Sequence, residues 1–188
     1  MNDLQFPISG YRLRVAKDDD KKFVMNCMKE SVLLSVPNDE SRLSDFWVDD
    51  ILDVTSVAMD SGIMRSEMFI LDDIDGERIG IMWIGISRDQ FTCEETGYLL
   101  GLYVTEGSRR KGLGRALVSC AEDWCRMNNI VSLTLNVGSN NGVAKDVYSR
   151  LGFKERSTVL RKRLYRPVPC TERDCGHSET ASTKSLNQ

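Results

Sequence analysis

The chain has 188 residues, of which 41% are apolar and 28% charged, and its formal net charge is −3. This composition is typical of a folded globular protein with a sizeable core, and it excludes the fibrous and intrinsically disordered classes. The apolar, uncharged stretch Thr96 to Thr105 is too short to span a bilayer, and Met1 to Leu4 show no signal-peptide pattern. We therefore expect a cytoplasmic protein without a membrane partner, and we expect its six scattered cysteines to be reduced thiols.

Charge is distributed unevenly along the chain. Acidic side chains outnumber basic ones about two to one up to Ser108, and the ratio is reversed from Arg109 onward. A polyanionic ligand on the C-terminal half and a cationic one near the N-terminal half would explain this split, and so would a solvated surface with a basic tail. The acidic isoelectric point, near 5.3, argues against a nucleic-acid partner.

The first half of the chain predicts, in order, a strand, two helices and a β-hairpin: Tyr11 to Lys17, about Lys21 to Ser35, about Glu40 to Met59, and Met68 to Leu71 with Arg78 to Ser87. Three aspartates before Lys21 can cap the first helix, and Pro37 ends it. The hairpin is indicated by an Asp-rich stretch ending at Gly76 between two β-prone runs.

The second half predicts a strand, a helix, a strand, a short helix and one or two final strands: Gly97 to Val104, Leu113 to Met127, Ile130 to Val137, Asn141 to Leu151, and Phe153 to Leu164. This order indicates an α/β protein, α+β by some schemes, with a mixed central β-sheet and helices on both faces. We expect one domain over residues 1–166 and a polar, flexible tail over residues 167–188.

A glycine-containing loop follows the Gly97 to Val104 strand directly and opens the next helix. Its unpaired N–H groups, from Arg110 to Arg115, and the helix dipole favour an anion, and the missing side chains at Gly112 and Gly114 leave room for a pyrophosphate. The spacing excludes a nucleotide-triphosphate loop, which ends in Gly-Lys-Ser/Thr, and a dinucleotide fingerprint, which needs glycine or alanine near Leu117. A solvated basic turn would give the same local pattern.

Two sequence blocks carry a resemblance to a known family. Arg109-Arg110-Lys111-Gly112-Leu113-Gly114 after a strand ending in Val104 is similar to the Arg/Gln-x-x-Gly-x-Gly/Ala signature of the GNAT superfamily of acetyltransferases. The segment from Asn141 to Phe153 resembles that family's N-x-x-A-x-x-x-Y-x-x-x-G-F block. The resemblance covers roughly Tyr11 to Arg166. It implies acetyl-CoA as donor, and a sheet splayed between two parallel strands, near Val104 and Val137, to admit the pantetheine arm.

The resemblance also implies site residues. Asn141 would hydrogen-bond the pantetheine arm, Ala144 would leave room for it, and Tyr148 would protonate the departing thiolate, while the backbone N–H of Val104 would meet the oxyanion. Asn141 could instead be a helix cap, and Tyr148 a core aromatic. The cofactor-binding residues we predict share these two blocks: Leu102, Tyr103, Val104, Arg109, Arg110, Lys111, Gly112, Leu113, Gly114, Arg115, Asn141, Ala144 and Tyr148.

The general base is harder to assign. Tyr98 occupies the strand position that often holds a glutamate in related enzymes, and Glu94 and Glu95 just upstream could act directly or through water. These two glutamates could also be exposed loop carboxylates. The single histidine, His177, falls in the tail, and a water chain is a further candidate.

We expect the acceptor to be a small primary amine. The aspartates of the second predicted helix could attract it or form a solvated face: Asp45, Asp49, Asp50 and Asp53. Strand Tyr98 to Val104 resembles that of some aminoglycoside N-acetyltransferases, but Leu100 replaces their glutamate. A protein N-terminal or lysine acetyltransferase, a non-catalytic acetyl-CoA sensor and a homodimer are left open. We predict no metal, because Cys170, Cys175 and His177 fit no zinc spacing.

Overall fold

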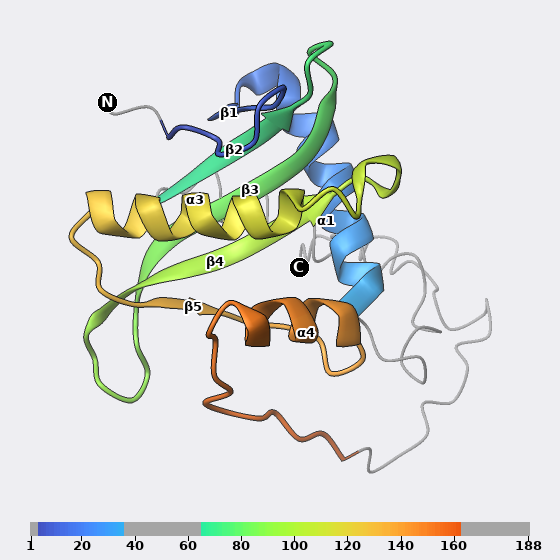
Figure 1. Cartoon of the computed structure of the whole chain (residues 1–188). Coiled ribbons are helices and arrows are strands. Elements are labelled where there is room, and N and C mark those ends of the chain that lie inside the picture. Colours follow the sequence, from blue (N-terminus) through green and yellow to red (C-terminus); the bar gives the residue numbers. More distant parts are fainter. Residues whose placement is uncertain (1–3, 36–64, 163–188) are drawn as a thin grey trace, which may run out of the picture. The chain divides into compact units, whose positions relative to one another are not determined.

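The computed structural model describes residues 4–35 and 65–162, and it divides into two units, Met1–Phe153 and Lys154–Gln188. The first unit holds a five-stranded sheet, whose strands are β1 (Arg12–Val15), β2 (Ser66–Asp72), β3 (Arg78–Arg88), β4 (Glu95–Val104) and β5 (Leu133–Leu135) (Figure 1). Their order in the sheet follows the chain. The first four strands pair antiparallel, and β5 adds to β4 in parallel, so the predicted mixed sheet is confirmed.

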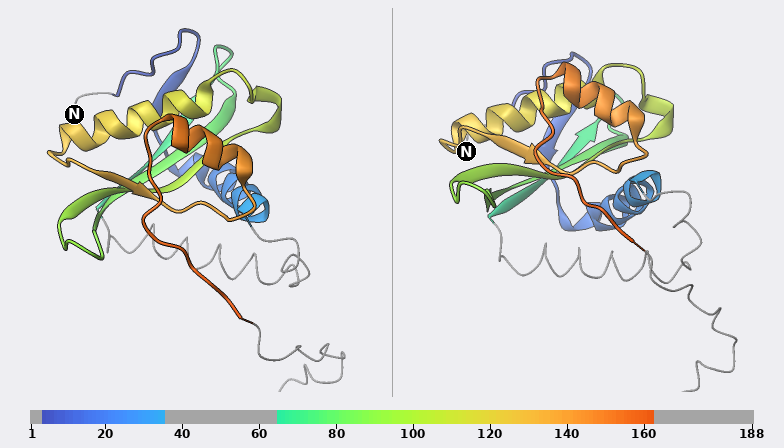
Figure 2. Two further views of the ribbon diagram at one scale, coloured as in Figure 1. Left: turned by 60° about the horizontal axis from the view of Figure 1, so that its bottom comes forward. Right: turned by 90° about the horizontal axis from the view of Figure 1, so that it is seen from below.

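Helices cover both faces of this sheet, as predicted. Helix α1 (Lys21–Ser35) lies on one face, and α3 (Leu113–Met127) and α4 (Gly142–Arg150) lie on the other (Figure 2). Short 3-10 turns, η1 (Asp18–Asp20) and η2 (Glu106–Ser108), precede α1 and α3. The predicted helix from Glu40 to Met59 lies outside the described residues. No helix in the described ranges is long and apolar enough to cross a membrane.

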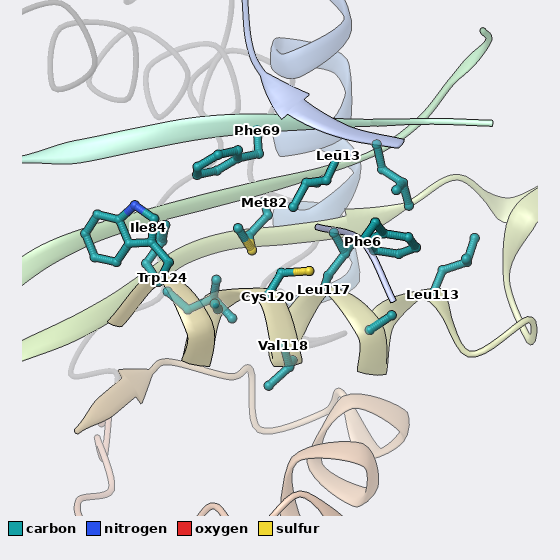
Figure 3. Close-up of a cluster of buried hydrophobic side chains, with 14 of the residues drawn as sticks. Phe6, Leu13, Phe69, Met82, Ile84, Leu113, Leu117, Val118, Cys120 and Trp124 are labelled. Carbon is teal, nitrogen blue, oxygen red and sulfur yellow. The ribbon is translucent and has the colours of Figure 1, made fainter. Parts of the chain in front are cut away.

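The core has one cluster on each side of the sheet. The larger cluster joins the sheet to the apolar face of α3 through residues such as Met82, Ile84, Leu117 and Trp124 (Figure 3). Most of these side chains are at most 5% exposed, which is the main source of stability for a sheet covered by a helix. The smaller cluster places Val24, Cys27 and Met28 of α1 against the opposite face.

A buried ion network ties the N-terminal strand to the hairpin. The Asp20 carboxylate, 1% exposed, accepts hydrogen bonds from Arg14 at 2.7 and 3.0 Å and pairs with Arg78 Nε at 2.7 Å. Arg14 Nε also donates to Asp72 at 2.6 Å. Each charge in the network therefore has a partner, which is the condition for burying it.

The prediction of one or two strands over Phe153 to Leu164 is wrong for residues 153–162, which contain no strand. The last two residues of that range lie outside the described part of the chain. The two large apolar side chains in the middle of this segment, Val159 and Leu160, are adjacent rather than alternate, and they are 95% and 89% exposed. Such a sequence has no apolar face of period two to bury. The predicted tail, residues 167–188, lies outside the described part of the chain.

Candidate active site

The parallel strands β4 and β5 part halfway along β4. Their pairing covers only Gly97 to Leu99 on β4 and Leu133 to Leu135 on β5. A β-bulge in β4 lies immediately beyond, because Ile84 pairs with Leu99 and Trp83 with Gly101, which leaves Leu100 unpaired. A bulge bends its strand and increases the local twist. The sheet therefore opens after Leu99 and Leu135, earlier than the resemblance implied.

The bulge decides which backbone groups face the opening. Thr105 N–H donates to Ile79 O at 2.9 Å. In an antiparallel pair every second residue directs its N–H toward the partner strand, so Tyr103 also directs its N–H toward β3. The N–H groups of Leu102 and Val104 consequently point away from β3, toward the side where β5 has diverged. Two backbone donors thus line the opening.

The loop after β4 forms an anion-binding helix start. Arg110 and Gly112 both adopt left-handed backbone conformations, with φ of 64° and 80°. The first helical N–H with an intrahelical partner at this end is that of Ala116, which donates to Gly112 O at 3.1 Å. The N–H groups of the first turn are therefore available, and a Cβ built on Gly114 would meet nothing within 4 Å. This geometry can accommodate an anion such as a pyrophosphate.

Arg109 has a role that the motif alone did not indicate. Its Nε donates to Val104 O at 3.0 Å, and its guanidinium carbon lies 5.2 Å from the centre of the Tyr103 ring. The first residue of the motif thus uses its side chain to fasten the loop to the end of β4.

A groove continues from this loop along the exposed side of α3. Its volume is about 430 Å³, and it is lined by Pro7, Ile8, Gly112, Arg115, Ala116, Ser119, Glu122 and Leu151. The α3 residues among these recur every three or four positions, so they form one stripe of the helix. An elongated ligand held at Gly112 could extend along this stripe past the positive charge of Arg115.

On the other side of the opening, β5 leads into α4. Asn141 caps this helix, its Oδ1 accepting a hydrogen bond from Ala144 N at 3.1 Å, so the capping alternative is part of its role. Asn141, Ala144 and Tyr148 are all half-buried on one face of α4, as their spacing predicted. The Tyr148 ring packs edge-on against Phe153 with centroids 5.6 Å apart, and burial raises the pKa of its phenol. Tyr148 is consequently protonated at neutral pH.

The structure does not bring Glu94 and Glu95 to the opening. Both are exposed, Glu94 just before β4 and Glu95 at its first position, and Leu102 lies seven positions after Glu95, which is roughly 20 Å along a strand. Tyr98 is half-buried beside the paired part of the strands, and burial raises the pKa of its phenol. Tyr98 is therefore suited to donate a hydrogen bond rather than to take a proton.

Two features escaped the sequence analysis. The first is the bulge, whose only signal was the break in alternation at Leu99-Leu100. The second is Glu30 of α1. Burial raises the pKa of Tyr103, the charge of Arg109 lowers it, and the charge of Glu30 raises it, so Glu30 of α1 is close enough to Tyr103 of β4 to influence it. Nothing in the helical pattern marked Glu30.

Within the described ranges no group of histidines, cysteines and carboxylates could hold a metal ion, and Cys170, Cys175 and His177 lie outside them.

Relatives and solved structures resemble the chain as follows. It is 34% identical over 92 residues to a mycothiol acetyltransferase from Streptomyces avermitilis, covering 49% of this chain and 29% of that protein. It is 30% identical over 87 residues to an aminoglycoside N(6')-acetyltransferase type 1 from Klebsiella aerogenes, covering 45% and 57%. The chain thus spans about half or less of the length of these curated relatives.

Solved structures share the fold over most of the chain. A candidate acetyl transferase from Pyrococcus furiosus matches with a TM-score of 0.70 at 20% identity, covering 82% of this chain and 99% of that one. A predicted acetyltransferase from Clostridium acetobutylicum, solved with acetyl-CoA, matches with a TM-score of 0.61 at 16% identity, covering 82% and 96%. The model of the Acetyltransferase (GNAT) family matches residues 38–153, which is more than half of the sequence, and the chain belongs to that family.

Proposed function

We propose that the protein is an acetyl-CoA-dependent N-acetyltransferase that acetylates the primary amine of a small molecule. The observation that carries this proposal is the opening between β4 and β5, which has an anion-binding helix start on one side and the Asn141 to Tyr148 face on the other. A ligand that joins a pyrophosphate to a long polar arm matches both sides.

The chain's own residues would divide the binding work. The first turn of α3 would hold the pyrophosphate with its N–H groups, and Arg115 in the α3 groove would face the adenosine end. The amide of Asn141 would bond the pantetheine arm, and the small side chain of Ala144 would let that arm pass. Acetyl-CoA supplies the activated acyl group.

The chemistry requires an oxyanion donor and a proton source. The N–H of Val104, directed into the opening, would stabilise negative charge developing on the carbonyl oxygen as the neutral amine attacks. The protonated phenol of Tyr148 would give its proton to the leaving sulfur. Because the glutamates of β4 lie far from the opening, we assign proton removal from the amine to water.

The acceptor class rests on two observations. Relatives named for mycothiol and aminoglycosides act on small molecules, and the carboxylate of Glu30 lies on the α1 side of the end of β4, where it could attract a cationic amine. We also propose a single catalytic domain over residues 1–166 and a reducing, cytoplasmic location. Cys27, Cys120 and Cys125 support that location as buried free thiols, and burial raises the pKa of Cys27 to about 12.

The test has two stages. Calorimetric titration with coenzyme A should show binding, and no heat at millimolar ligand would remove the proposal. Release of free coenzyme A thiol should then be measured over a panel of small amines, with unacetylated peptides that carry a free N-terminal amine or a lysine as the comparison. Turnover on peptides alone would replace the small-molecule acceptor with a protein one, and turnover on neither would leave an acetyl-CoA sensor.

A further inference from the structure

Two glycines bring α1 against both sides of the opening. A methyl group built on Gly101 of β4 would lie 2.9 Å from Met28 Sδ. One built on Gly138, in the loop after β5, would lie 2.5 Å from Ser35 O and 2.8 Å from Ser35 Cα. Met28 and Ser35 are two turns apart on α1, which is about 10 Å along the helix. Helix α1 therefore bridges the gap where β4 and β5 are no longer hydrogen-bonded.

The two contacts differ in how far they can yield. Opposite Gly101 lies the end of a flexible methionine side chain, which can rotate away. Opposite Gly138 lies the backbone of the last turn of α1, which cannot. The backbone of Gly138 is outside the left-handed region, so contact alone excludes a side chain there.

Gly138 is also connected to the predicted site. Its carbonyl oxygen accepts a hydrogen bond from Asn141 N at 3.0 Å, which closes the turn that starts α4. Lys145 Nζ donates to Ser139 O at 3.0 Å in the same turn. A displacement of Gly138 is therefore transmitted to Asn141 and, through α4, to Tyr148.

We propose that Gly138 is a positioning residue: by letting the end of α1 seat against this loop, it fixes the separation between Tyr148 on α4 and Val104 on β4. This inference rests on the proposed acetyl transfer. The pyrophosphate-binding turn of α3 follows β4 and makes no part of this contact, so it should be insensitive to Gly138.

The experiment compares Gly138→Ala with Gly142→Ala. An alanine at position 138 must push Ser35 O away by about 0.9 Å to restore a 3.4 Å contact, whereas a Cβ at Gly142 meets nothing within 4 Å. A misplacement of about 1 Å in a catalytic site costs on the order of 100-fold in kcat. We expect Gly138→Ala to lower kcat by that order and to weaken coenzyme A binding, while binding of adenosine 3′,5′-bisphosphate, which lacks the pantetheine arm, is unchanged. Gly142→Ala should change none of these.

A rescue variant covers the case in which Gly138→Ala folds poorly. Ser35→Gly frees the last turn of α1 to shift, so the double variant should recover part of the lost kcat. Unchanged kcat in Gly138→Ala, or equal weakening of coenzyme A and the bisphosphate, would overturn the positioning role. Wild-type protein that binds no coenzyme A would instead contradict the proposed function.

Discussion

Replacing Gly114 with leucine should raise stability and lower coenzyme A affinity at the same time. Gly114 is the second residue of α3, and a Cβ there would meet no protein atom within 4 Å. Leucine has a helix propensity better than that of glycine by about 0.7 kcal/mol. For a chain of this length, that gain corresponds to a rise of roughly 2 °C in Tm.

The same leucine would occupy the space in front of the unpaired N–H groups of the first turn. Loss of two charge-assisted hydrogen bonds to a pyrophosphate costs about 3 kcal/mol. This corresponds to roughly 100-fold in Kd. Calorimetric titration with coenzyme A would measure the affinity, and thermal unfolding without ligand would measure the stability.

The control is Gly107→Leu, since Gly107 lies in η2 of the same connection and a Cβ there also meets nothing within 4 Å. Its coenzyme A affinity should match that of the wild type. The opposite signs of the two effects of Gly114→Leu exclude misfolding as the cause of weaker binding. Unchanged affinity in Gly114→Leu would refute the placement of the pyrophosphate at α3.

Three further substitutions test other parts of the molecule. Tyr148→Phe should lower kcat by about 100-fold, the usual contribution of a general acid, with coenzyme A affinity kept; equal turnover would remove Tyr148 as the proton source. Asp20→Asn should lower the free energy of unfolding by about 3 kcal/mol, because it leaves Arg14 and Arg78 without their buried anion. The hydrogen bond from Arg14 lowers the pKa of Asp20 from an ordinary 3.8 to about 2. The wild type should therefore lose the stability that the ionised Asp20 contributes as pH falls from about 4 to 2, whereas Asp20→Asn should show no such loss. Acid unfolding curves that run parallel for the two proteins would contradict this expectation. Arg109→Lys should lower kcat and coenzyme A affinity together, since lysine has no planar group to stack on Tyr103 while bonding Val104 O, and unchanged kinetics would count against the fastening role.

The elements were predictable where their patterns were local. The apolar stripe of α3 and the turn ending at Gly76 specify a helix and a hairpin without reference to the rest of the chain, and both were confirmed. The length of β5 was not predictable. Ile130 to Val137 is rich in strand-forming residues, but only Leu133–Leu135 pairs with β4 as a strand, and beyond Leu135 the bulge at Leu100 turns β4 away. A bulge is a property of two strands in register, and the break in alternation at Leu99-Leu100 does not by itself predict one.

The structure gives Arg109 and Gly114 of the cofactor motif different roles, although the sequence suggested the same role for both. From sequence, Arg109 and Gly114 are both candidate ligand contacts. In the structure the guanidinium of Arg109 is already engaged by Val104 O and the Tyr103 ring, while the space at Gly114 is open. The N–H of Val104, our proposed oxyanion donor, belongs to the same residue whose carbonyl oxygen Arg109 holds. The arginine therefore links the loop that opens α3 to the strand residue that carries this proposed donor, and the glycine leaves open the space beside the first turn of α3.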